Sequence, residues 1–263
     1  MNLLKNIRQV FLDMDGTIYH GSNLYPTTIP FLDFLDSHKI GYMFVSNNSS
    51  IGLKEYVEKL AMMGIQSIED SFYTSTEYAV DYLKKNYPDV KRLFLLGTPS
   101  IIPAFENAGF RLDEETPQCV VVAFDKGLTY KRLCKAAWFL KKGVLGIATH
   151  PDVFCPSDEA TWLVDCGAIT KALEVSTGVK LNVLGKPDPG MLLAAAKRKK
   201  VSAKECLMIG DRLATDIAVG INAGMQTCRI VGPGADRTDV KGIHPDYTMK
   251  DLGELQKYWE QKL

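Results

Sequence analysis

Short apolar runs alternate with segments of helical periodicity along almost the whole chain. Short apolar runs are typical of buried strands, and apolar residues that recur every three or four positions are typical of helices packed on a sheet. We predict strands over residues 10–13, 41–45, 72–73, 92–96, 120–123, 145–148, 182–184, 206–209 and 225–231. We predict helices over residues 29–38, 53–63, 77–86, 101–108, 129–142, 168–176, 189–199 and 214–223. This alternation indicates an α/β protein with a doubly wound parallel sheet.

Polar residues gather where four of these segments stop, in residues 13–17, 46–50, 185–190 and 210–216. Open parallel sheets bind ligands in the crevice outside the carboxyl ends of their strands. Between about residues 75 and 180 no such polar strand end occurs. We therefore predict a core made of residues 1–75 and 181–263, interrupted by an inserted α/β domain of residues 76–180.

The bulk composition is that of an ordinary globular protein. The chain has 263 residues, of which 46% are hydrophobic and 24% charged, enough for a sizeable core. Lys plus Arg and Asp plus Glu both number 31, so the formal net charge is zero. We therefore expect a small-molecule partner, and neither a nucleic acid nor an anionic membrane surface.

The apolar segments, the first residues and the cysteines indicate where the protein is located. No apolar stretch approaches the roughly 20 residues that span a bilayer, and the first residues lack the apolar region of a signal peptide. None of the six cysteines forms a Cys-x-x-Cys pair. We interpret them as buried thiols in a reducing compartment and expect a cytoplasmic protein.

The segment of residues 10–17 offers the most specific chemistry, because an apolar strand ends in Asp13 and Asp15, followed by Gly16. Alone, two carboxylates spaced in this way are most often solvated loop residues. At a phosphoryl group, Asp13 would attack phosphorus and form an aspartyl-phosphate, which splits one hard displacement into two easier ones. Asp15 would protonate the leaving oxygen and later deprotonate water, a role worth roughly 10²–10⁴-fold.

Two carboxylates repel a phosphate dianion, so this chemistry requires a cation. Mg²⁺ prefers oxygen ligands and commonly takes one or two carboxylates together with phosphate oxygens. Asp211 is placed to supply the second carboxylate from another strand end, and Asp216 to orient Asp211 or a metal-bound water. The alternative for Asp216 is a carboxylate at a helix N-terminus, where the helix dipole favours it.

Ser46 and Lys186 are the candidate phosphate-binding side chains. Ser46 offers a hydroxyl, and the amides that follow it lead toward a helix, which is a natural anion site. Ser46 could equally cap that helix. Lys186, between Gly185 and Pro187, could neutralise Asp13 and the phosphate, although a loop lysine is usually solvated. Phosphoryl transfer demands mainly positioning and charge compensation, which this set supplies.

Together the four segments resemble the motifs of the haloacid dehalogenase (HAD) superfamily of aspartyl phosphatases. Residues 13–17 match the first motif, Ser46 the second, Lys186 the third, and residues 210–216 the fourth. The resemblance implies a Rossmann-like core, an aspartyl-phosphate intermediate and Mg²⁺. The implied metal ligands are the Asp13 side chain, the Asp15 backbone carbonyl and the Asp211 side chain, with Asp216 behind them. The expected phosphate-binding residues are Met14, Asp15, Ser46, Asn47 and Lys186.

Residues 185–189 and 210–217 look like the NagD-like, p-nitrophenylphosphatase-type branch (class IIA, with a C2-type α/β cap). Residues 124–130 and 148–152 resemble cap segments of that branch, and in relatives the second loop contributes to substrate choice. The resemblance thus implies Thr149, His150 and Asp152 as substrate residues. His150 stands where relatives commonly have Asn. It would contact a leaving group or an anion when protonated, or form a structural hydrogen bond.

The sequence therefore predicts a Mg²⁺-dependent phosphatase acting on small phosphomonoesters such as sugar phosphates, nucleotides or aryl phosphates. One alternative is a phosphotransferase or mutase, which would pass the phosphoryl group to an alcohol instead of water. Another is an inactive binding or regulatory module, whose signature would be the loss of a catalytic position. Similar proteins suggest a homodimer.

Overall fold

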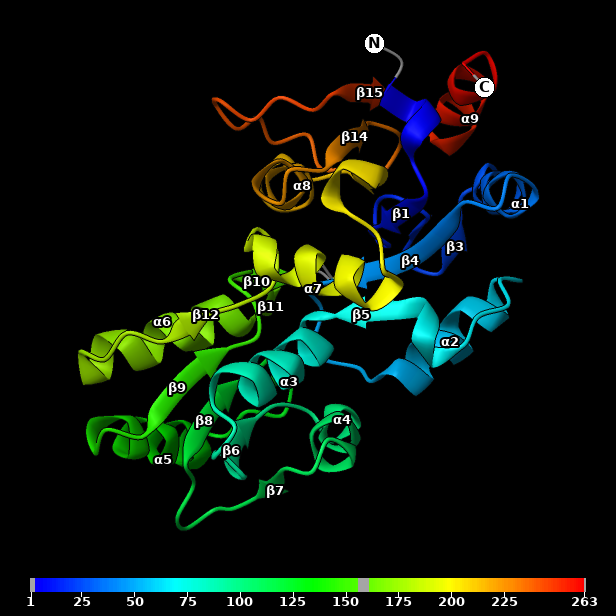
Figure 1. Ribbon diagram of the computed structural model, residues 1–263. Helices are drawn as coiled ribbons and strands as arrows, with labels where there is room; N and C mark the ends of the chain where they lie inside the picture. Colours follow the sequence, from blue (N-terminus) through cyan, green and yellow to red (C-terminus); the bar gives the residue numbers. More distant parts are fainter. Residues whose placement is uncertain (1–2, 156–160, 263) are drawn as a thin grey trace. The chain divides into compact units, whose positions relative to one another are not determined.

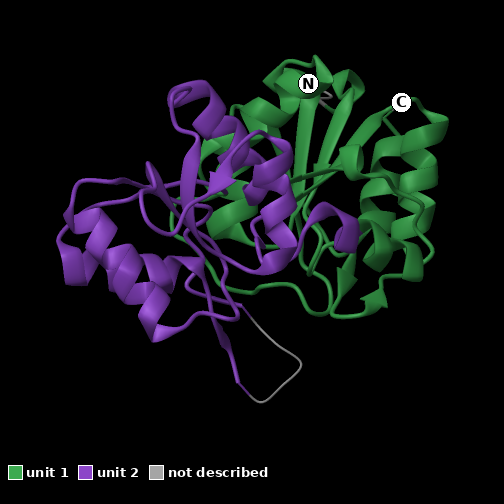
Figure 2. Cartoon of the chain, turned by 90° about the horizontal axis from the view of Figure 1, so that it is seen from below, with its two compact units in different colours: residues 1–46, 57–73, 186–263 green, residues 47–56, 74–185 purple. Residues whose placement is uncertain are grey.

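The computed structural model describes residues 3–155 and 161–262. The chain forms two compact units, which Figure 2 colours separately. Unit 1 comprises residues 1–46, 57–73 and 186–263, and unit 2 comprises residues 47–56 and 74–185. Compared with the predicted core of residues 1–75 and 181–263, three segments that the sequence assigned to the core group with unit 2, namely residues 47–56, 74–75 and 181–185.

Unit 1 is built on a six-stranded sheet in the order β15-β14-β13-β1-β4-β5 (Figure 1). Its strands are β1 (Gln9–Leu12), β4 (Gly41–Ser46), β5 (Phe72–Thr74), β13 (Cys206–Gly210), β14 (Gln226–Ile230) and β15 (Tyr247–Met249). β1 pairs in parallel with both β13 and β4. Every residue of β1 and β13 is buried, as expected of central strands covered on both faces.

The helices of unit 1 follow from the direction of the strand crossovers. From β1 the chain moves one way to β4 and β5, and later the other way from β13 to β14. Right-handed crossovers in opposite directions place helices on opposite faces of the sheet. α1 and α9 accordingly pack together, as do α7 and α8. These helices are α1 (Thr28–Ser37), α7 (Pro189–Lys199), α8 (Ala218–Asn222) and α9 (Leu252–Glu260).

Unit 2 has its own sheet of five strands in the order β12-β9-β8-β6-β7, in which neighbouring strands run parallel. Its strands are β6 (Arg92–Leu96), β7 (Arg111–Leu112), β8 (Cys119–Val122), β9 (Leu145–Ala148) and β12 (Asn182–Val183). Its helices are α3 (Ser75–Asn86), α4 (Ile102–Asn107), α5 (Tyr130–Lys141) and α6 (Cys166–Thr177). The predicted α/β fold with doubly wound parallel sheets is thus confirmed.

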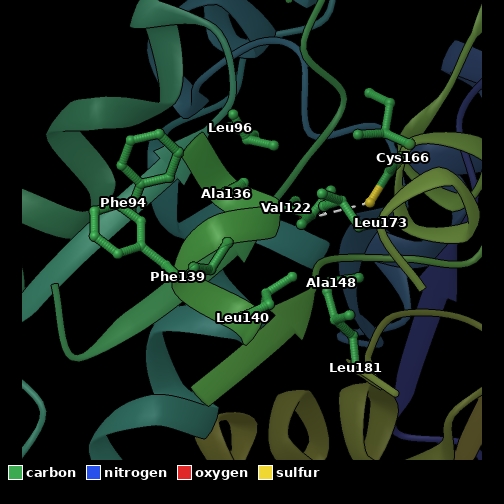
Figure 3. Close-up of a cluster of buried hydrophobic side chains, with 12 residues drawn as sticks. Phe94, Leu96, Val122, Ala136, Phe139, Leu140, Ala148, Cys166, Leu173 and Leu181 are labelled. Atoms are coloured by element: carbon green, nitrogen blue, oxygen red, sulfur yellow. Dashed lines mark hydrogen bonds between the residues drawn. The ribbon is translucent and has the colours of Figure 1, made fainter. Parts of the chain in front are cut away.

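The core of unit 2 lies between its sheet and the pair α5 and α6 (Figure 3). The ring of Phe94 in β6 packs against the ring of Phe139 in α5 at a tilt of 59°, with the centroids 5.3 Å apart. Cys166, the first residue of α6, is fully buried and its thiol donates to the Val122 carbonyl at 3.3 Å. These contacts fix both helices on one face of the sheet.

Most predicted elements are present, and the differences have local causes. The predicted helix over residues 214–223 is present, but its first part is a π-helical turn, η5 (Leu213–Ile217), which continues directly into α8. Such wide turns often occur at functional sites. The elements not predicted are mostly very short, namely β2 (Tyr19–His20), β3 (Asn23–Leu24), β7, β10 (Phe154–Cys155), β11 (Leu163–Val164), β15 and α9.

The remaining helical elements are short or lie at the division between the units. α2 (Leu53–Met62) crosses from unit 2 into unit 1. The 3-10 turns are η1 (Leu3–Asn6), η2 (Glu69–Ser71), η3 (Pro99–Ile101) and η4 (Ala203–Glu205). Within residues 3–155 and 161–262, no helix has the length and apolar character that a membrane crossing requires.

Glu174 of α6 gives a testable stability prediction. Its carboxylate accepts from Lys171 Nζ at 2.8 Å, Lys180 Nζ at 3.2 Å and the Leu181 amide at 3.2 Å. These bonds, that from Lys171 foremost, lower the pKa of Glu174 from 4.5 to about 2. A carboxyl with a lowered folded-state pKa stabilises the fold above its unfolded pKa, and this contribution disappears as pH falls from about 4.5 to 2.

We expect Glu174→Gln to lower the free energy of unfolding by about 1–2 kcal/mol at pH 7, because a charged hydrogen-bond acceptor is lost. The loss stays modest because the two lysine side chains are exposed to water and remain solvated. The difference from wild type should shrink below pH 4.5 in urea titrations. Glu106→Gln, on an exposed position of α4, is the control. Equal stability of the two variants at pH 7 would contradict this account.

Candidate active site

The switch point of the unit 1 sheet lies between β1 and β13, where the chain turns in opposite directions. Leu12 of β1 is in register with Ile209 of β13 on one side and Phe44 of β4 on the other. Asp13, Asp211 and Ser46 come just after these positions. They therefore emerge at one edge of the sheet, at the place where doubly wound sheets bind ligands.

Lys186 is buried at this edge between two carboxylates. Its Nζ donates to Asp13 Oδ1 at 2.5 Å and to Asp216 Oδ1 at 2.6 Å. Only 3% of the lysine side chain is exposed. A solvated loop lysine, the alternative considered from sequence, does not describe this residue.

The turn after β1 brings the backbone close to Asp211. Met14 accepts from the Thr17 and Ile18 amides at 3.1 and 2.9 Å, and Gly16 has φ of +85°. A Cβ on Gly16 would lie 2.5 Å from Asp211 Oδ2. Only glycine satisfies both the left-handed backbone and this close approach.

Asp15 differs from Asp13 in its exposure. Its side chain is 64% exposed, whereas that of Asp13 is 13% exposed. Asp15 Oδ1 lies 3.7 Å from His20 Nδ1 on the β2–β3 hairpin. The Asp13 carboxylate is thus held beside an ammonium, whereas most of the Asp15 side chain is exposed to solvent.

The two remaining carboxylates are oriented by backbone amides. Asp211 Oδ2 accepts from the Asp236 amide at 2.6 Å. Asp216 Oδ2 accepts from the Arg212 amide at 3.1 Å, while its Oδ1 receives Lys186. The alternative of a simple helix-dipole carboxylate therefore does not account for Asp216, which is 1% exposed and ion-paired.

Charge is unbalanced among these groups. Burial, and next the negative charge of Asp216, raise the pKa of Asp13 to about 8 and that of Asp211 to about 7. Burial alone would lower the pKa of Lys186, but the carboxylates of Asp13 and Asp216 outweigh it and raise that pKa. Three carboxylates around one ammonium leave excess negative charge, which a divalent cation would offset.

The residues also fit such a cation geometrically. Ligand oxygens of Asp13, Asp211 and Asp216 lie within 4.8 Å of one another. Asp211 Oδ1 is buried and has no hydrogen-bond partner among the described residues. A buried acceptor of this kind is costly unless something binds it, and carboxylate oxygens are what Mg²⁺ prefers.

The other predicted site residues divide between the two units. Ser46 ends β4 in unit 1, and the Met14 side chain is buried in that unit's core. Asn47 belongs to unit 2, where its Nδ2 donates to Asp152 Oδ2 at 3.2 Å. The structure therefore brings together Asp13, Asp211, Asp216 and Lys186, with Ser46 at the same sheet edge.

Thr149 and His150 are fully buried inside unit 2. Both approach Ser49 Oγ, from Thr149 Oγ1 at 2.9 Å and from His150 Nε2 at 3.1 Å. The Phe124 amide donates to the same hydroxyl at 2.9 Å. This geometry is that of the structural hydrogen bond considered for His150. Asp152 is partly exposed, at 18% of its side chain.

Sequence reasoning missed two residues that contact the site. They are Asp236, through its amide, and Arg229, whose Nε donates to the Asp211 carbonyl at 3.1 Å. A usable signal existed for Arg229, because it is a charged residue within the strand Gln226–Ile230, which is mostly buried.

Comparisons with known proteins agree with this geometry. A model of haloacid dehalogenase-like hydrolases matches residues 10–111, and a HAD-hydrolase-like model matches residues 183–255. An acid sugar phosphatase of Staphylococcus aureus is 32% identical over 254 residues, which cover 95% of this chain and 97% of the relative.

Two solved structures are similar to this chain in both fold and sequence. The 4-nitrophenylphosphatase of Thermotoga maritima is 40% identical, with a TM-score of 0.91 and coverage of 97% of this chain and 98% of that one. A putative nagD protein is 38% identical, with a TM-score of 0.90 and coverage of 96% and 98%. The chain therefore belongs to the haloacid dehalogenase-like hydrolases, as a NagD-like phosphatase.

The close approach of Gly16 to Asp211 can be tested against a glycine of the same conformation. Gly143 also has φ of +85°, but a Cβ there would meet no described atom within 4 Å. Either Gly→Ala change costs about 1–2 kcal/mol of backbone strain. We expect Gly16→Ala to lower phosphatase activity at least about 100-fold, because it displaces Asp211, and Gly143→Ala to leave it within about twofold. Similar activities of the two folded variants would refute the steric argument.

Proposed function

We propose that this enzyme hydrolyses small phosphomonoesters, with sugar phosphates and aryl phosphates as the first candidates, through an aspartyl-phosphate on Asp13 and with Mg²⁺. The observation that carries the proposal is the buried ammonium of Lys186, 2.5 Å from Asp13 and 2.6 Å from Asp216. It supplies positive charge beside a carboxylate nucleophile. The relatives' acid sugar phosphatase and 4-nitrophenylphosphatase names support the substrate class.

In the first step an Asp13 carboxylate oxygen attacks phosphorus, and the bond from phosphorus to the ester oxygen breaks. Asp15 gives its proton to the departing oxygen, so the product leaves as an alcohol. In the second step water attacks phosphorus, Asp15 takes its proton back, and the bond to Asp13 breaks. Lys186 keeps Asp13 in place and offsets charge on the phosphoryl oxygens in both steps.

Asp13, Asp211 and the Asp15 carbonyl are the residues we assign to Mg²⁺. Bound there, the ion would neutralise phosphoryl oxygens and relieve repulsion between the phosphate and the carboxylates. Both oxygens of Asp216 already accept hydrogen bonds. We therefore give Asp216 the role of fixing Lys186 and the turn that follows Asp211.

Phosphate binding is assigned to Ser46, Lys186 and the backbone of Met14, Asp15 and Asn47. Of the three cap residues implied by resemblance, Asp152 is the candidate for substrate choice because its side chain is partly exposed. Thr149 and His150, both buried, support its loop. All six cysteines are thiols, although Cys134 is exposed and Cys155 is half-buried, so the prediction that all six are buried is wrong for these two. Cysteines in the thiol form support a cytoplasmic location. The homodimer stays a prediction.

The nucleophile is tested by phosphate release from a panel of phosphorylated metabolites, with and without Mg²⁺. We expect Asp13→Asn to reduce release by at least about 10⁴-fold, because an amide cannot form the aspartyl-phosphate. Asp33→Asn, which removes an exposed carboxylate of α1, should leave it unchanged. Substantial Mg²⁺-dependent turnover by Asp13→Asn would overturn the assignment. Phosphoryl transfer to added alcohols in preference to water would instead favour a phosphotransferase.

The acid–base role of Asp15 is tested by the leaving group. 4-Nitrophenolate departs without a proton, whereas a sugar alkoxide requires one. We expect Asp15→Asn to release about one equivalent of 4-nitrophenol per enzyme in a burst, followed by slow turnover. With a sugar phosphate no burst should occur. Equal impairment of the first turnover on both substrates in stopped-flow and quench measurements would exclude Asp15 as the acid.

A further inference from the structure

Arg229 lies in β14, outside every motif of the phosphatase reaction, and its guanidinium binds three carbonyls. Nε donates to the Asp211 carbonyl at 3.1 Å. Nη2 donates to the Asp236 carbonyl at 2.8 Å and approaches the Thr238 carbonyl at 3.4 Å. One side chain thus joins the backbone of Asp211 to the loop of residues 236–238.

That loop in turn holds the Asp211 carboxylate. The Asp236 amide donates to Oδ2 of Asp211 at 2.6 Å, a short charge-assisted bond. The Asp236 carboxylate accepts from the Thr238 amide at 2.7 Å, which closes the loop on itself. Pro233 precedes this loop in the chain, and its carbonyl accepts a hydrogen bond from the Tyr25 hydroxyl at 2.5 Å.

The second carboxylate oxygen of Asp211, Oδ1, is left in a different position from Oδ2. Because Oδ2 is fixed by the amide, the carboxylate cannot rotate freely, and Oδ1 is the buried oxygen that lacks a partner among the described residues. An oxygen held in this way is preorganised for a cation. Groups that orient a metal ligand in other proteins typically contribute 10–100-fold to metal affinity.

We propose that Arg229 is a positioning residue for the divalent cation: it clamps the 236–238 loop on Asp211, so that Oδ2 is occupied and Oδ1 is presented to the metal. The inference rests on the metal site of the proposed function and extends it to a residue outside the catalytic motifs. A planar guanidinium reaches several carbonyls from one side chain, which a lysine ammonium does not do with the same geometry.

The test measures Mn²⁺ binding to the full-length protein without substrate, by the loss of the free-ion signal in electron paramagnetic resonance, with Mg²⁺ as competitor. We expect Arg229→Met to weaken Mn²⁺ binding about 10-fold or more, and Arg229→Lys to restore only part of the loss. Arg237→Met removes the same charge from an exposed position of the same loop. It should leave the dissociation constant unchanged, which separates geometry from net charge.

A second pair of variants isolates the amide itself. Asp236→Pro and Asp236→Ala both lose the carboxylate, but only proline lacks the N–H that binds Asp211. We expect Asp236→Pro to weaken Mn²⁺ binding clearly more than Asp236→Ala. Because this pair leaves Arg229 intact, it tests the clamp even if Arg229→Met fails to fold, which circular dichroism would reveal.

The outcomes distinguish this inference from the proposed function. Wild-type affinity in folded Arg229→Met, or equal affinity in the two Asp236 variants, would overturn the clamp while leaving the phosphatase proposal intact. Failure of the wild-type protein to bind Mn²⁺ or Mg²⁺ would overturn the metal site and the inference together. Phosphate release by wild type, measured in parallel, shows whether the enzyme's activity survives that result.

Discussion

The site depends on one buried ion cluster, in which the Lys186 ammonium lies between Asp13 and Asp216. An ammonium at 3% exposure is stable only when it is paired and hydrogen-bonded. The pairing fixes Asp13, the proposed nucleophile, in space and ties the strand β1 to the π-helical turn after β13. The same cluster contains three carboxylates and one ammonium, so a bound divalent cation would offset its excess negative charge.

The topology of the unit 1 sheet places these charged groups together. β1 and β13 are fully buried strands at the switch point of the sheet, so residues almost 200 positions apart emerge side by side. Gly16 then allows the turn to pass within reach of Asp211. In unit 2, the hydroxyl of Ser49 accepts from the Phe124 amide and is hydrogen-bonded to the side chains of Thr149 and His150. These bonds hold the loop after Ser46 against the ends of β8 and β9. This network explains why residues 47–56 group with unit 2.

The sequence predicted what depends on pattern and missed what depends on individual contacts. Fully buried strands such as β1 and β13, and their polar ends, follow from apolar runs, so the candidate site is recognisable in the amino-acid sequence alone. The π-helical turn was missed because its residues have ordinary helical periodicity. Arg229 itself could have been noticed as a charged residue in a mostly buried strand, but its contacts could not, because they join a side chain to backbone carbonyls and backbone acceptors leave no trace in the sequence. The role of His150 was ambiguous from the sequence, because an imidazole can form hydrogen bonds either within a loop or with a substrate.

The most direct test of the central claim, that Asp13 is a covalent nucleophile, is to trap the intermediate. The enzyme would be mixed with substrate and Mg²⁺, quenched in acid within milliseconds, digested and examined by mass spectrometry. The account predicts a phosphoryl group on the peptide that contains Asp13, appearing before free phosphate and disappearing at the turnover rate. Phosphate formed at full rate with no phosphorylated Asp13 at any time would contradict it and would indicate direct attack by water.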